Sequence, residues 1–336
     1  MPPSLDLPKP PSDLQGMRKG DQVILTWTVP TTTTDRQIVR NPGPTEICRR
    51  LVSELTECGT PVGTAAPLQI ATLNKNNRRQ KTPESYTDTL PVEAFSETPL
   101  ATITYAVEVL NSGNRGAGLS NQIKVPLIRT LPPPQNFAAH VTSQGVVLNW
   151  SGVTPPSIPQ VHFVYRVYRR REDQQQTVVV GDLPVGAETK YTLTDSEIEW
   201  EKTYEYHADA ITIVAAPDKP EVQVEGADTS EIKDFADDVF PPSVPTGLQA
   251  VFSGPGQKPF IDLIWAPDTD ADLAGYNVYR RTEGTPFVKI NVELLKTPSY
   301  RDFGIEPGHS YIYSVTAVDV RGNESARSEE ASENVP

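Results

Sequence analysis

Residues 261–265 read Ile-Asp-Leu-Ile-Trp, and they are the third copy of an apolar run that ends in tryptophan. The second copy is Val-Val-Leu-Asn-Trp at residues 146–150, and the first is Val-Ile-Leu-Thr-Trp at residues 23–27. Successive tryptophans are separated by roughly 120 residues, which is the length of a domain and too long for a solenoid repeat. We therefore predict three related domains.

Further features recur in the same order in each copy. In the third copy, proline-rich residues 241–245 precede the tryptophan. After the tryptophan come three segments: one ending in two arginines (278–281), a short one ending in aspartate (300–302) and one that begins with tyrosine (313–317). Apolar and polar side chains alternate along the last of these, which is typical of a β-strand with one buried face. The pattern predicts a β-sandwich in each copy.

The composition narrows the classes of fold and partner. The chain has 33 prolines in 336 residues, and proline breaks helix interiors, so a mostly helical fold is not expected. The formal net charge is −13. Nucleic acids and anionic membranes bind clustered lysine and arginine, and we therefore expect neither as a partner. No apolar run reaches about 18 residues, so we expect no transmembrane segment.

The third copy resembles the fibronectin type III domain. Residues 305–311, Ile-Glu-Pro-Gly-His-Ser-Tyr, are similar to the tyrosine corner of that family, whose hydroxyl bonds to nearby backbone. Residues 272–280 resemble the third strand of bacterial members, and residues 321–325 take the place of the loop between the sixth and seventh strands. The second copy keeps Tyr204 at the corner spacing, whereas the first has Ile103 there.

The resemblance implies an all-β fold of three tandem immunoglobulin-like (fibronectin type III) β-sandwiches. We place a flexible proline-rich lead at residues 1–9, a divergent first domain at 10–128, a second domain at 129–240 and a third at 241–336. The joints are short and rich in proline, which predicts an elongated arrangement with semi-rigid joints. The expected core residues are Trp27, Trp150, Trp265, Tyr204 and Tyr311.

The two cysteines, Cys48 and Cys58, are close in sequence. If each lies on one arm of a hairpin, their Cβ atoms meet across it, and we expect a disulfide. Such a bond would suit an oxidising compartment. The alternative is a pair of unbonded thiols.

Alternating aspartates make one candidate metal site. Asp268, Asp270 and Asp272 resemble the start of a calcium loop, since alternate carboxylates converge on one hard cation. An EF-hand would continue with glycine and glutamate where this chain has Leu273 and Tyr279. The alternative, which we favour, is an acidic loop whose aspartates bond local backbone. No cofactor is expected.

Histidines and arginines offer two other candidate sites. His140, His162 and His207 share the second predicted domain, but their spacing fits no zinc motif, and we expect His207 at the surface. The arginine pairs lie at residues 49–50, 169–171 and 280–281. One interpretation is a ladder of cationic contacts for an acidic polymer. The alternative, which we favour, is that their side chains cover tyrosine and apolar surface while their head groups lie in water.

The chain also has no nucleophile elbow and no phosphate-binding glycine loop, so we do not expect an enzyme. We expect a non-catalytic, exported cell-surface protein that serves as a structural spacer, an adhesive rod or an assembly subunit. It would contact a protein or cell-envelope polymer, or copies of itself, through sandwich edges and loops. The alternative is a carbohydrate- or protein-binding accessory module of an extracellular polysaccharide-processing system, which a row of exposed aromatic side chains would favour. Residues 1–8 lack the basic and apolar regions of a signal peptide, so we expect the export signal, with a lipid anchor, in a precursor.

Overall fold

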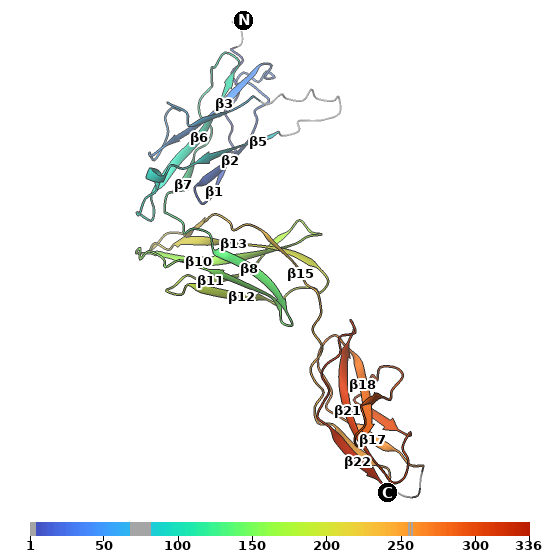
Figure 1. Cartoon of the computed structure of the whole chain (residues 1–336). Coiled ribbons are helices and arrows are strands. Elements are labelled where there is room, and N and C mark those ends of the chain that lie inside the picture. The colour runs from blue at the N-terminus through green and yellow to red at the C-terminus, as the bar shows by residue number, and fades with distance from the viewer. Residues whose placement is uncertain (1–4, 68–81, 255, 257) are drawn as a thin grey trace. The chain divides into compact units, whose positions relative to one another are not determined.

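The computed structural model describes residues 5–67, 82–254, 256 and 258–336. Within these residues the regular structure is β-strand, with one 3-10 helix, η1 (Val92–Ala94). The strands of the described residues form five sheets that build three sandwiches (Figure 1), because one eight-stranded sheet runs through the first two sandwiches. The prediction of an all-β fold with three sandwiches is therefore confirmed. No helix among the described residues is long and apolar enough to cross a membrane.

One side of the first sandwich is the end of the eight-stranded sheet, which consists there of β1 (Gln15–Lys19), β2 (Gln22–Thr28) and β5 (Pro83–Thr89). Its second sheet, β4-β3-β6-β7, consists of β4 (Gly63–Ala65), β3 (Pro42–Arg50), β6 (Thr102–Asn111) and β7 (Ile123–Pro126). Alternate residues of β2 and β6 point inward and form one core cluster that includes Trp27 and Tyr105.

The second sandwich repeats this plan with one added strand, β14 (Val222–Glu225). One sheet contains β8 (Gln135–Thr142), β9 (Gly145–Ser151) and β12 (Lys190–Asp195). The other contains β10 (Val161–Arg171), β11 (Thr177–Pro184), β13 (Thr203–Val214), β14 (Val222–Glu225) and β15 (Ile232–Phe235). Both β14 and β15 pair with the long strand β13. Trp150 stacks on Tyr191 inside this sandwich, with ring centroids 5.9 Å apart.

The third sandwich has the simplest form. Its first sheet contains β16 (Gln249–Phe252), β17 (Ile261–Ile264) and β20 (Ser299–Asp302). Its second sheet contains β19 (Val288–Lys289), β18 (Leu273–Thr282), β21 (His309–Asp319) and β22 (Ala331–Val335). Trp265 lies in its core cluster. Each sandwich is thus built around its own buried tryptophan.

The first two sandwiches form one compact unit, and the third forms a second unit that begins near Ala236. The link within the first unit is a parallel pairing of β1 with β14, where Lys19 stands opposite Glu225. The sequence pattern does not predict this seam, because β14 lies in the additional segment of the second copy, residues 217–230.

The predicted flexible lead is partly docked on the first sandwich. The Lys9 N–H donates a hydrogen bond to the carbonyl oxygen of Thr32 at 2.9 Å, and the Thr34 N–H donates to that of Leu7 at 3.0 Å. Residues 1–4 of the lead lie outside the described residues. The backbone of residues 7–9 is thus bonded to the first sandwich.

Candidate functional site

Each sandwich contains one arginine, one aspartate and one tyrosine that join its two sheets. The arginine lies on β3, β10 or β18, and the tyrosine stands opposite it on the paired strand, β6, β13 or β21. The aspartate lies on the facing sheet, in β5, β12 or β20. We call each set an Arg-Asp-Tyr triad. The triads are Arg49, Asp88 and Tyr105; Arg169, Asp195 and Tyr206; and Arg280, Asp302 and Tyr313.

The geometry of the triads is nearly the same in all three sandwiches. In the third, the Tyr313 hydroxyl donates to Asp302 Oδ2 at 2.9 Å, and an Arg280 guanidinium N–H donates to the same oxygen at 2.8 Å. The corresponding distances are 2.6 and 2.7 Å in the first sandwich and both 2.9 Å in the second. The three aspartates are buried. Each carboxylate is therefore satisfied by charged and neutral donors, as a buried charge requires.

The triads change the interpretation of the arginine pairs. Our prediction that the arginine head groups lie in water is wrong for the first arginine of each pair, since each one bonds a buried aspartate. Those arginines are not free to form a cationic ladder either. In the third sandwich the second arginine, Arg281, is about as exposed as Arg280 and pairs with Glu330 at 2.8 Å. Burial, together with the neighbouring carboxylate, raises the pKa of Tyr313 and of its two counterparts, so these hydroxyls remain donors.

The predicted tyrosine corner is present in the third sandwich. The Glu306 N–H donates to the Tyr311 hydroxyl oxygen at 2.9 Å, and Tyr311 is 6% exposed. The guanidinium of Arg280 lies over the Tyr311 ring, 5.0 Å from its centroid. Tyr204 takes the same place under Arg169 in the second sandwich, while the first has the buried Ile103.

A disulfide joins Cys48 and Cys58, whose Cα atoms are 4.9 Å apart. The sequence suggested that the two cysteines lie on opposite arms of a hairpin, but they do not. Cys48 is in β3, whereas Cys58 lies in the loop that follows this strand. They form a small cluster with Leu55 and Ala106, outside the main core of the first sandwich.

The three aspartates of the calcium-like segment do not converge. The Asp270 N–H donates to Asp268 Oδ1 at 2.9 Å, and Asp270 Oδ2 accepts the Ser243 N–H at 2.8 Å. These bonds to local backbone are of the kind that the acidic-loop interpretation describes.

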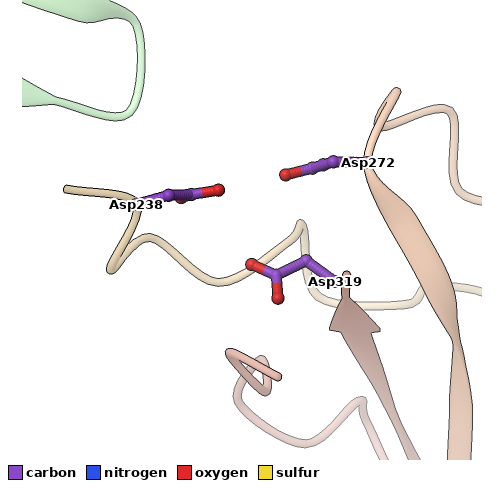
Figure 2. Close-up of side chains that lie close together, drawn as sticks. All are labelled: Asp238, Asp272 and Asp319. Carbon is purple, nitrogen blue, oxygen red and sulfur yellow. The ribbon is translucent and has the colours of Figure 1, made fainter. Parts of the chain in front are cut away.

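Asp272 meets Asp238 and Asp319, and one carboxylate oxygen of each lies within 4.8 Å of the others. Figure 2 shows the three carboxylates directed toward one another. Asp319 Oδ1 accepts the N–H groups of Arg321 and Asn323, both at 2.8 Å, which fixes the turn after β21. Burial raises the pKa of Asp238 despite a hydrogen bond from the Phe240 N–H, and the two other carboxylates raise it further.

Such a cluster of three aspartates holds like charges together, and a proton or a hard cation bound there would relieve the repulsion. We did not predict Asp238 or Asp319 as members. Asp319 is the last residue of β21, and Asp238 lies just before the proline-rich segment 241–245, so only the fold brings them to Asp272.

The histidines of the second sandwich are dispersed. His162 is exposed, and His140 lies near Asn149, with 3.4 Å between a ring nitrogen and the amide nitrogen. His207 is half-buried rather than at the open surface, because Tyr168 stacks on it with ring centroids 4.8 Å apart.

Comparison with known proteins assigns the family. A solved structure, described as a Fn3-like protein from Clostridium thermocellum, is 33% identical in sequence. The match covers 96% of that chain and 29% of this one, with a TM-score of 0.25. The chain belongs to the fibronectin type III family.

The fibronectin type III chain also matches parts of much longer proteins. It is 28% identical over 252 residues to exoglucanase B from Cellulomonas fimi, a match that covers 71% of this chain and 21% of the relative. It is 37% identical over 98 residues to an amylopullulanase from Thermoanaerobacterium saccharolyticum, which covers 29% of this chain and 7% of that relative. The chain thus spans about a fifth or less of these curated relatives. No family model matches it.

The surface of the fibronectin type III domains has few open aromatic side chains. Among the described residues, Phe235 (48%) and Phe303 (50%) are the aromatic side chains with large exposed fractions. They belong to different compact units. The described surface of neither unit therefore presents a row of exposed rings.

Proposed function

We propose that this chain is a non-catalytic accessory region of an exported polysaccharide-processing protein, where it acts as a structural spacer. One observation carries the proposal: relatives named exoglucanase and amylopullulanase match the chain over only 21% and 7% of their own length. In each of them the matched segment is one part beside a much larger remainder. An exported location follows from the same association and agrees with the disulfide.

The described structure supports a spacer more than a sugar-binding module. Sugar rings commonly pack on exposed aromatic side chains, and each unit has one aromatic ring of this kind among its described residues. The charged groups that recur in the three sandwiches are engaged in the triads. Their repeated bonds stabilise the sandwiches, as a spacer requires.

Two measurements on the purified chain test this function. Incubation with soluble and insoluble α- and β-glucans should release no reducing sugar above buffer. The chain should also remain in the supernatant when insoluble glucan is sedimented. Release of reducing ends in proportion to chain concentration, lost on heat denaturation, would show an enzyme. Sedimentation with glucan that Phe303→Ser abolishes would show a sugar-binding module instead.

A segment exchange tests the spacer role directly. Deleting the matched 252-residue segment of the Cellulomonas fimi relative should reduce its action on insoluble glucan. Inserting this chain in its place should restore most of that action. If the deletion has no effect, or if this chain does not restore what a flexible linker of equal length restores, the spacer proposal is wrong.

A further inference from the structure

Asp209 is a buried acid that the triads do not use. It lies on the outer face of β13, and its side chain is fully buried, with 0% exposed. Neither of its carboxylate oxygens has a hydrogen-bond partner among the described residues. A buried ionised carboxylate without partners is unfavourable, so this position calls for a proton or a compensating charge.

The groups around Asp209 come from five places in the first unit, its own strand included. Lys19 comes from β1, Glu225 from β14, Asp228 from the loop after β14, and Arg166 and Tyr168 from β10, with His207 on its own strand. The Lys19 ammonium lies 2.7 Å from Asp228 Oδ1 and 3.6 Å from Glu225 Oε2. Arg166 is committed to Asp182 through two hydrogen bonds of 2.8 and 2.7 Å.

The charges around Asp209 therefore do not balance when it is ionised. Lys19 already faces two carboxylates, and Asp209 would add a third. Burial raises the pKa of Asp209 to about 7, with Lys19 and Arg166 opposing the shift and Glu225 and Asp228 adding to it. Burial also lowers the pKa of His207, although the nearby Asp228 carboxylate opposes this shift. The imidazole therefore supplies little positive charge near neutrality.

The same residues hold the seam between the first two sandwiches. Lys19 and Glu225 are the paired residues of β1 and β14, and the Gly20 N–H donates to the carbonyl oxygen of Glu225 at 2.8 Å. Electrostatic repulsion at Glu225 and Asp228 therefore acts directly on the strand pairing.

We propose that Asp209, Lys19, Glu225 and Asp228 form a proton-operated latch on this seam, closed when Asp209 carries a proton and loosened when Asp209 is ionised. With the proton in place, one ammonium bridges two carboxylates across β1 and β14. Loss of the proton leaves three carboxylates around the same ammonium. The seam is then more strongly held at mildly acidic pH than above neutrality.

The sign of the pH effect follows from the two states of Asp209. An unfolded aspartate has a pKa of about 3.9, so between about pH 4 and 7 the folded chain holds a proton that the unfolded chain has released. Stability contributed by this proton is present below about pH 4 and is lost as the pH rises toward 7. The latch is independent of the proposed spacer function.

Carboxyl-carbon NMR and amide exchange on the whole chain test the latch. We expect the Asp209 carboxyl to titrate near pH 7, and the protection of the Gly20 amide, corrected for its intrinsic exchange rate, to fall about tenfold from pH 5.5 to 8.5. In Asp209→Asn the protection of Gly20 should no longer depend on pH. Glu225→Gln should move the Asp209 titration to lower pH.

Asp262→Asn in the other unit is the matched control, because Asp262 is an exposed partner of Arg301. It should change neither readout. The Ser325 amide, bonded to the Ala317 carbonyl in that unit, should keep its protection across the same pH range. Titration of Asp209 below pH 5 in the unmodified chain, or protection of Gly20 that does not change with pH, would overturn the proposal even if a variant fails to fold.

Discussion

The first and third sandwiches share one set of side-chain contacts between their two sheets, but they differ in their other stabilising contacts. Both contain an Arg-Asp-Tyr triad. The third adds the tyrosine corner between Tyr311 and Glu306, whereas the first has Ile103 in that position and a disulfide elsewhere. The difference indicates that the triad is the contact between sheets that all three sandwiches have in common. The first sandwich does without the tyrosine corner and the third does without a disulfide, so the loss of either should be less damaging than loss of the triad.

Removal of the triad aspartate should give the largest effect, and it should be similar in both sandwiches. Asp302→Ala leaves the Arg280 charge and the Tyr313 hydroxyl without their buried acceptor. We expect a loss of about 3–5 kcal/mol in the free energy of unfolding of the third sandwich. Asp88→Ala should cost the first sandwich a similar amount. Urea dependence of amide exchange in β21 and β6 measures the two separately.

The exposed pair of Arg301 and Asp262 is the control for the triads. Its side chains are 50% and 41% exposed, so Asp262→Ala should cost less than about 1 kcal/mol. Equal losses from Asp262→Ala and Asp302→Ala would contradict the central place of the triad.

Loss of the disulfide should have the next largest effect and should remain within the first unit. The double variant Cys48→Ala, Cys58→Ala should lower its free energy of unfolding by about 2–3 kcal/mol, because the bond closes a short loop of the unfolded chain. Amide exchange in β21 should not change. Reduction of the parent chain should reproduce the loss, and equal stability of the reduced and oxidised chains would contradict it.

The tyrosine corner should contribute less than the disulfide. Tyr311→Phe removes the hydroxyl that accepts the Glu306 N–H, and we expect a loss of about 1–2 kcal/mol in the third sandwich. Tyr300→Phe is the matched variant, since its hydroxyl makes only a 3.3 Å hydrogen bond to the Ile290 carbonyl. Thermal denaturation of both variants should rank Tyr311→Phe as the less stable.

The smallest effect, and a gain, should come from the aspartate cluster of the second unit. Asp272→Asn removes one of the charges that raise the pKa of Asp238. A raised pKa in the folded state lowers stability as the pH rises, so this variant should be more stable at pH 7 by less than about 1 kcal/mol. The gain should vanish at acidic pH. Urea denaturation in chelator-treated buffer measures it.

A calcium titration sharpens the same test. If repulsion alone governs the cluster of Asp238, Asp272 and Asp319, millimolar calcium leaves the Tm of the parent chain unchanged. A rise in Tm that Asp272→Asn removes would instead identify the cluster as a cation site.

Much of the fold could be predicted from the sequence because its signals are local. Alternating strands, three tryptophans and the Pro-Gly corner before Tyr311 each reflect a short segment that buries one face. The seam of β1 with β14 could not be predicted, because the two strands are far apart in sequence and join through backbone groups, which leave no signal in the sequence. The docking of residues 7–9 was missed for the same reason.

The site residues were visible in the sequence but their contacts were not. The arginine pair, the terminal aspartate and the leading tyrosine each recur three times, yet strand periodicity does not say that they meet across two sheets. Asp209 stands at an outward position of an alternating strand, which predicts a solvated side chain. It is buried near Lys19, Glu225 and Asp228, and only the tertiary structure brings Lys19 of the first sandwich to this place.

The pairing of β1 with β14 determines where the polypeptide tolerates truncation. A fragment that stops at residue 128 keeps β1 but loses its neighbour, which exposes backbone donors and acceptors to unwanted association. Separation near residue 236 leaves every strand of β16 to β22 with its partners. Recombinant dissection should therefore treat the chain as a double module followed by a single one.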